Sequence, residues 1–176
     1  MRKSMFTTRG IVIIALLVAM SVLLKSFFSI EFQVYRISFY EIPLMILGFI
    51  AGPIAGFVGG LITDVMHIIF SPLAFTFNFF TMATISWGFI PGLFLFKKNV
   101  SKTTIIMVVV FTSLIAFTFN SLGIYSYYGM GAVVGGLPWR LITLVVKIPI
   151  DIIIVGGLIK RFNTLDEFNF EEVYSK

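Results

Sequence analysis

Five charged or titratable side chains lie inside otherwise apolar stretches of the chain, and they are the residues that could do chemistry. They are Asp64, His67, Arg140, Lys147 and Asp151. A charge at the centre of a bilayer costs about 2.5 to 3.5 kcal/mol on insertion scales, so such residues usually face a partner or a water-filled space. They are therefore candidates for ligand binding, for a proton relay or for structural ion pairs.

Each of these residues also has a structural interpretation. Lys147 and Asp151 are four residues apart, which allows an ion pair within one helix. His67 is the only histidine, and it lies three residues after Asp64, on the same helical face; a lone histidine is more often a hydrogen-bonded structural residue than a ligand. Arg140 follows Pro138 and Trp139, where snorkelling to lipid headgroups and capture of an anion are both open. Asp64 has no cation beside it in the sequence.

Several classes of chemistry are excluded. The chain has no cysteine and one histidine, so thiolate catalysis, disulfides and multi-histidine metal sites are not expected. No nucleophile elbow, zinc-protease motif or phosphate-binding glycine loop is present. We expect no metal, no cofactor, no enzyme activity and no ATPase within this chain.

The composition indicates which solvent surrounds the elements that hold these residues. The chain has 176 residues, of which 59% are apolar and 12% are charged, and its mean hydropathy is +1.04. A soluble domain carries roughly 25% charged residues, so this chain is predicted to lie in lipid. The net charge of +5 is then explained by basic residues at cytoplasmic helix ends, and no nucleic-acid partner is expected.

Six apolar stretches qualify as membrane helices. The predicted ranges are 10–28, 40–51, 54–70, 77–96, 103–123 and 138–158. Alternating apolar and polar residues over 29–39 predict an extended segment or short hairpin. The glycine- and tyrosine-rich stretch after 123 is predicted to be a loop, and the acidic residues 162–176 a flexible tail.

The basic residues predict the topology. Nine of the 13 lie where a chain of six spans with both ends inside would place them, as cytoplasmic segments collect lysine and arginine. These nine are Arg2, Lys3, Arg9, Lys97, Lys98, Lys102, Lys160, Arg161 and Lys176. The remaining four, Lys25, Arg36, Arg140 and Lys147, are left for the outer half or the interior. Both termini are therefore predicted to be cytoplasmic.

Small residues repeat at four-residue spacing in two places. Ala15 and Ala19 form one pair, and a row comprises Gly48, Gly52, Gly56 and Gly60. This spacing lets helix backbones approach closely in lipid.

Together these features resemble the substrate-binding S components of energy-coupling factor (ECF) vitamin transporters. The segments that carry the resemblance are Ala15-Leu-Leu-Val-Ala19, Arg36-Ile-Ser-Phe-Tyr-Glu-Ile-Pro43, Gly48-Phe-Ile-Ala-Gly-Pro53 followed by Asp64, and Leu137-Pro-Trp-Arg140. The last segment is most similar to the folate-specific members. The resemblance implies an all-α fold, a single domain over 1–176 and an integral bundle of six membrane helices.

The same resemblance implies the function and the partners. The protein would bind folate or a reduced folate at the outer face of a bacterial cell membrane. It would then dock on a transmembrane T subunit that is coupled to two ATPase subunits, topple in the membrane and release the vitamin inside. Ala15 and Ala19 resemble the family's docking motif.

Folate chemistry indicates roles for particular residues. Arg36 and Arg140 are available for the glutamate carboxylates of the vitamin, because arginine pairs with carboxylates in a directional, bidentate way. Asp64, with Asn78, could accept from the donor edge of the pteridine, and Trp87 or Trp139 could stack on its rings. The predicted ligand-binding set is Arg36, Asp64, His67, Asn78, Trp87, Trp139 and Arg140.

Three rival functions stay open at this point. The first is an S component for another vitamin, such as pantothenate or a thiamine precursor. The second is an ion-coupled secondary carrier that uses Asp64 and His67 as a proton relay. The third is a membrane enzyme acting on lipid or isoprenoid substrates, which the missing catalytic motifs disfavour.

Overall fold

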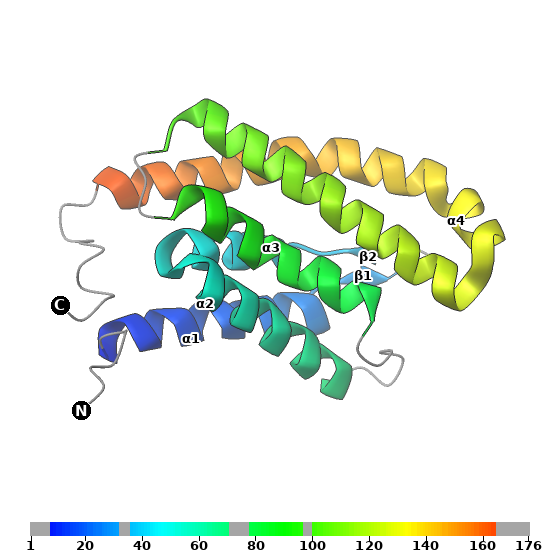
Figure 1. The fold of residues 1–176 in the computed structure, drawn as a ribbon, viewed down its shortest axis with the longest axis horizontal. Helices are drawn as coiled ribbons and strands as arrows, with labels where there is room; N and C mark the ends of the chain where they lie inside the picture. Colours follow the sequence, from blue (N-terminus) through cyan, green and yellow to red (C-terminus); the bar gives the residue numbers. More distant parts are fainter. Residues whose placement is uncertain (1–7, 32–35, 71–77, 97–99, 165–176) are drawn as a thin grey trace.

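The computed structural model describes residues 8–31, 36–70, 78–96 and 100–164 of the chain. In chain order its elements are α1 (Thr8–Ser26), β1 (Ile30–Glu31), β2 (Arg36–Ile37), α2 (Glu41–Phe70), α3 (Phe79–Leu95) and α4 (Lys102–Thr164). The fold is a helical bundle in which α4 turns back on itself, so that its two halves run in opposite directions (Figure 1).

Two of the helices are broken at a single glycine. Gly52 in α2 has φ 84° and Gly129 in α4 has φ 76°, a region of backbone space that only glycine enters readily. Each break divides its helix into two arms: residues 41–51 and 53–70 of α2, and residues 102–128 and 130–164 of α4. The described residues therefore form four helices where six were predicted, because two predicted pairs are each continuous except at one glycine.

The first break was predicted and the second was not. The turn expected at Gly52-Pro53 is confirmed. The loop expected between 123 and 138 is wrong, since helical backbone continues on both sides of Gly129. A helix pairs the backbone N–H and C=O groups of the segment with one another, so it can form even where the composition is typical of a loop. The helix also extends to Thr164, past the predicted start of the tail, and residues 165–176 lie outside the described residues.

The antiparallel pairing of β1 with β2 confirms the extended hairpin predicted after the first helix. Ile30 lies opposite Ile37, and Glu31 lies opposite Arg36. The hairpin joins α1 to the buried first arm of α2, so it positions the beginning of that arm.

Glycines let α2 and α3 pack with their backbones in contact. A methyl group at Gly48 or at Gly56 would overlap the carbonyl oxygen of Gly88, and one at Gly60 would overlap the backbone of Ile85. The close approach predicted from the four-residue spacing is therefore confirmed at these three positions. The remaining glycine of the row, Gly52, forms the break instead.

The hydrophobic core surrounds the first arm of α2. Its side chains Leu44, Met45, Leu47 and Phe49 are fully buried. By contrast, many large apolar side chains of α1 and α4 are exposed, including Leu16, Val145 and Ile153. α2 and the stretch Lys102–Arg161 of α4 are each long and apolar enough to cross a membrane. An apolar surface of this kind suits a hydrocarbon solvent.

Candidate functional site

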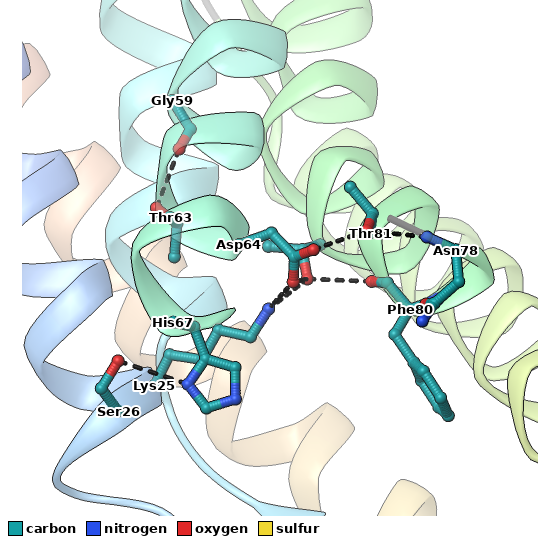
Figure 2. A network of polar contacts seen from close by, with 10 residues as sticks. Lys25, Ser26, Gly59, Thr63, Asp64, His67, Asn78, Phe80 and Thr81 are labelled. Atoms are coloured by element: carbon teal, nitrogen blue, oxygen red, sulfur yellow. Dashed lines mark hydrogen bonds and ion pairs between the residues drawn. The ribbon is translucent and has the colours of Figure 1, made fainter. Parts of the chain in front are cut away.

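Asp64 lies at the centre of a buried polar network that connects three helices. Lys25 of α1 forms an ion pair with Asp64 Oδ1 and donates to Thr84 Oγ1 at 2.6 Å. Thr81 Oγ1 donates to Asp64 Oδ2 at 2.5 Å, and Thr84 Oγ1 lies 3.3 Å from Asp64 Oδ1 (Figure 2). We call Lys25, Asp64, Thr81 and Thr84 the Lys25–Asp64 network. Both oxygens of Asp64 therefore already accept hydrogen bonds from the protein itself.

Lys25 is the partner that sequence reasoning missed. It lies 39 residues before Asp64, so local spacing could not have paired them. One signal was available, because Lys25 is a basic residue within an apolar helix and away from the predicted cytoplasmic ends. A lysine in that position needs a counter-charge, and Asp64 was the other charge with no partner in its own helix.

His67 lies one turn beyond Asp64 on the same face of α2, as the spacing predicted. Its Nδ1 atom is 3.3 Å from Ser26 Oγ, and the side chain is buried (Figure 2). His67 therefore faces the end of α1, beside the network.

Asn78 caps the N-terminus of α3. Its side-chain oxygen accepts from the backbone N–H of Phe80 at 2.8 Å, and its Nδ2 atom donates to the hydroxyl of Tyr127 at 3.0 Å. The rings of Phe80 and Tyr127 stack with centroids 6.3 Å apart. Asn78 thus joins α3 to the first arm of α4, close to the Lys25–Asp64 network through its capping partner Thr81.

The two tryptophans have different surroundings. Trp87 of α3 belongs to the hydrophobic core and is 8% exposed. Trp139 on α4 is 60% exposed, whereas the next residue, Arg140, is 6% exposed. The structure therefore does not bring Trp139 together with the other predicted site residues.

Arg140 points into the bundle and contacts the first arm of α4. Its Nη2 atom donates to Ser121 Oγ at 2.7 Å and to the carbonyl oxygen of Phe117 at 3.3 Å. The guanidinium carbon lies 4.6 Å from the centroid of the Phe117 ring. Its Nη1 atom is buried and has no hydrogen-bond partner within the described part of the chain. One end of this guanidinium is therefore available to a ligand.

A second buried cluster comprises Glu41, Lys147 and Asp151, and we call it the Glu41 cluster. Lys147 forms an ion pair with Glu41 and donates to the carbonyl oxygen of Ser38 at 2.6 Å. Asp151 lies one helical turn beyond Lys147 on the same face of α4. The ion pair that the spacing allowed between Lys147 and Asp151 is thus replaced by one between α4 and α2.

The Glu41 cluster is unbalanced in charge and in hydrogen bonds. It holds two carboxylates and one ammonium group. Two of its buried oxygens, Glu41 Oε2 and Asp151 Oδ1, have no hydrogen-bond partner among the described residues, whereas Glu41 Oε1 is held in the ion pair with Lys147. Sequence reasoning did not select Glu41, although its place directly before the apolar run 42–51 was a signal. These oxygens can accept hydrogen bonds from a ligand.

The remaining predicted residues lie elsewhere. The backbone of Arg36 is in β2, but its side chain lies outside the described residues. Ala15 and Ala19 are both exposed on one face of α1. The predicted residues are therefore divided between the Lys25–Asp64 network and its neighbours on α2 and α3, the hairpin, the second arm of α4 and the surface of α1.

Comparison with known proteins gives a consistent result. A family model described as "ECF transporter, substrate-specific component" matches residues 9–159. The folate transporter FolT of Clostridium novyi (strain NT) is 26% identical over 163 residues, which are 92% of this chain and 94% of that protein.

Solved structures agree with the sequence matches. A crystal structure of FolT bound with folic acid has a TM-score of 0.75 and 29% identity, and the match covers 84% of this chain and 90% of that one. The S component of a bacterial ECF transporter has a TM-score of 0.62 and 20% identity, over 89% and 98% of the two chains. The second match shows the shared fold.

Proposed function

This chain belongs to the family of ECF transporter substrate-specific components, and from that premise we propose that it binds folate or a reduced folate for import. The observation that carries the proposal is the match to FolT bound with folic acid, which extends over 84% of this chain at 29% identity. Members of the family are substrate-binding subunits and not enzymes.

Arg140 is the residue best placed to hold the anionic end of folate. It is buried, it is fixed by Ser121, and its Nη1 atom is unpartnered within the described residues. A guanidinium group held in this way can pair with a carboxylate of the glutamate moiety. Arg36, in the hairpin, is proposed to bind the second carboxylate.

We propose that the other predicted ligand residues also contact the vitamin, and they differ in how far each would have to change its present contacts. Asp64 would have to exchange hydrogen bonds with Lys25 and Thr81 to accept from a pteridine. Trp139 would have to turn inward from an exposed position. His67, Asn78 and Trp87 are buried or half-buried near α3, where they could contact the rings of the vitamin.

We also propose six membrane-crossing segments with both ends in the cytoplasm of a bacterial cell. The two arms of α2 and the two arms of α4 supply four of these segments, and α1 and α3 supply the other two; the first arm of α2 is short for a span and is buried within the bundle. The support is the distribution of basic residues, because Lys102 and Lys160 lie at helix ends that this topology places inside.

The experiment that tests folate binding is calorimetry on the purified protein. Folic acid should bind tightly at one molecule per protein without ATP or an ion gradient. The absorption spectrum of the protein as purified should show a co-purified pteridine. If pantothenate or a thiamine precursor binds and folic acid does not, the folate proposal is wrong and the family assignment is unaffected.

Docking on a T subunit is proposed to use Ala15 and Ala19. Both are exposed on α1, and small residues at this spacing allow another helix to approach closely. Replacing both by tryptophan should abolish folate uptake by the protein reconstituted with T and ATPase subunits, while folate binding is retained. Parallel loss of binding would contradict the docking role. Uptake by this chain alone under a proton gradient would favour the carrier alternative instead.

A further inference from the structure

The second arm of α4 carries a stripe of buried residues along one face, interrupted by the half-buried Lys147. Arg140, Lys147, Asp151, Val155 and Ile159 follow one another at intervals of seven or four residues, which places them on one side of a helix. Val155 and Ile159 belong to the hydrophobic core. The polar members of the stripe occupy the part of the arm nearer to Gly129.

Unpartnered polar atoms lie at both ends of the polar part of this stripe. At Arg140 the buried Nη1 atom is a donor without a partner in the described chain. At the other end, the buried oxygens Asp151 Oδ1 and Glu41 Oε2 are acceptors without a partner in the described chain. Buried polar groups in native proteins are nearly always paired, so exceptions need an explanation.

The spacing separates these two kinds of atom. Arg140 and Asp151 are eleven residues apart, a rise of about 16 Å along the helix. A single small ion could not satisfy both ends. A long molecule with an anionic group at one end and N–H donors at the other end could do so.

We propose that Glu41 and Asp151 accept the N–H edge of the pteridine ring, formed by its 2-amino group and N3–H, while Arg140 binds the glutamate end. The inference rests on the proposed function and assigns the ring a different acceptor from Asp64. It is favoured because both oxygens of Asp64 are occupied by Lys25, Thr81 and Thr84, whereas Glu41 Oε2 and Asp151 Oδ1 have no partner among the described residues.

The charges of the cluster fit this role. Lys147 neutralises one carboxylate through its ion pair with Glu41, and Ser38 of the hairpin exit holds the same ammonium group. The remaining carboxylate charge strengthens hydrogen bonds from neutral N–H donors. Glu41 and Asp151 would therefore determine specificity for the ring end of the vitamin.

The test is a double-mutant cycle in which one change is made in the protein and the other in the ligand. The wild-type protein and the variants Asp151→Asn, Glu41→Gln and Asp64→Asn are titrated with folic acid. The same proteins are titrated with the folic acid analogue in which a methyl group replaces the 2-amino group. The wild type should bind the analogue about 10- to 100-fold more weakly, which is the effect of losing a hydrogen bond to a charged group.

The variants then locate the acceptor. Asp151→Asn or Glu41→Gln should weaken folic acid binding by a similar factor and reduce the discrimination between the two ligands to about threefold or less, since the cycle measures the lost coupling. Asp64→Asn should keep the wild-type discrimination. Discrimination that is lost in Asp64→Asn and kept in the other two variants would overturn the proposal.

Two further outcomes are distinguishable. A wild-type protein that binds both ligands equally overturns the assignment of the ring edge and leaves folate binding intact. A wild-type protein that binds no folic acid overturns the proposed function and this inference together. Thermal unfolding without ligand identifies a variant that does not fold, and in that case the other member of the Glu41 cluster supplies the test.

Discussion

The Lys25–Asp64 network and the Glu41 cluster are both buried, both contain an ion pair between helices, and differ in how completely they are paired. In the network, one lysine faces one carboxylate, and two threonine hydroxyls complete the hydrogen bonds of Asp64. In the cluster, one lysine faces two carboxylates, and two oxygens, Glu41 Oε2 and Asp151 Oδ1, are left without a partner among the described residues. The first arrangement serves stability, and the second holds acceptors ready for a ligand.

The largest effect is expected when the network loses its cation. Lys25→Met leaves the carboxylate of Asp64 buried without a counter-charge, which should lower the free energy of unfolding by about 3 to 5 kcal/mol. Denaturant unfolding of the detergent-solubilised protein measures this change. The matched control is Lys102→Met, which alters an exposed lysine at the start of α4 and should have little effect.

A second substitution separates the loss of an ion pair from the loss of packing. Adding Asp64→Leu to Lys25→Met removes the unpaired charge, and replacement of a buried pair by apolar residues is often neutral. The double variant should therefore recover most of the lost stability. If it is as unstable as Lys25→Met alone, packing and not charge explains the role of Lys25.

A smaller effect is expected at the hydroxyl that completes the network. Thr81→Val keeps the shape of the side chain but removes the donor to Asp64 and the acceptor for the backbone N–H of Asn78. The free energy of unfolding should fall by about 1.5 to 3 kcal/mol, the range for a hydrogen bond to a charged group. Thr118→Val is the control, because that exposed hydroxyl donates only to its own helix. Equal changes in the two variants would contradict the importance of the network.

On α4, removal of one acceptor from Arg140 should cost less. Ser121→Ala leaves Nη2 with the carbonyl oxygen of Phe117, so the free energy of unfolding should fall by only about 1 kcal/mol. Unfolding of Ser126→Ala, an exposed serine on the same arm, provides the comparison. If the free energy of unfolding falls as much as in Lys25→Met, Arg140 contributes to stability as strongly as the Lys25–Asp64 network does.

The smallest change, with the opposite sign, is expected in the Glu41 cluster. Asp151→Asn removes a charge that lies near Glu41, and Asp151 Oδ1 has no hydrogen bond in the described chain to lose. Without ligand, the variant should be as stable as the wild type or more stable by up to about 1 kcal/mol, because like charges in a buried site repel each other. A marked loss of stability would show that the Glu41 cluster stabilises the fold, as the Lys25–Asp64 network does.

The sequence predicted the elements better than the contacts between them. Hydropathy and period-two alternation located α1, α3 and the hairpin, and the Gly52-Pro53 pair located the break in α2. The break at Gly129 was missed, because glycine- and tyrosine-rich composition is typical of a loop, whereas the structure keeps helical backbone on both sides of this single glycine.

For the candidate site, the residues were found more readily than their partners. Asp64, Arg140 and Lys147 are recognisable by their charge in apolar surroundings. Their partners are distant in sequence: Lys25 lies in α1, and Glu41 begins α2. Only the three-dimensional packing brings these groups together, and so only the structure shows which carboxylate is already satisfied.

The shortness of the first arm of α2 has a consequence for biosynthesis. Residues 41–51 rise only about 16 Å, roughly half the thickness of the hydrocarbon core. A nascent chain that ends at Gly52 therefore offers the membrane-insertion machinery no complete span, and the first arm must enter together with residues 53–70. Lys147, the counter-charge of Glu41, leaves the ribosome only after a further hundred or so residues. The ion pair between Glu41 and Lys147 can therefore form only after α4 is made, so the pairing of α2 with α4 is a late step in the assembly of the bundle.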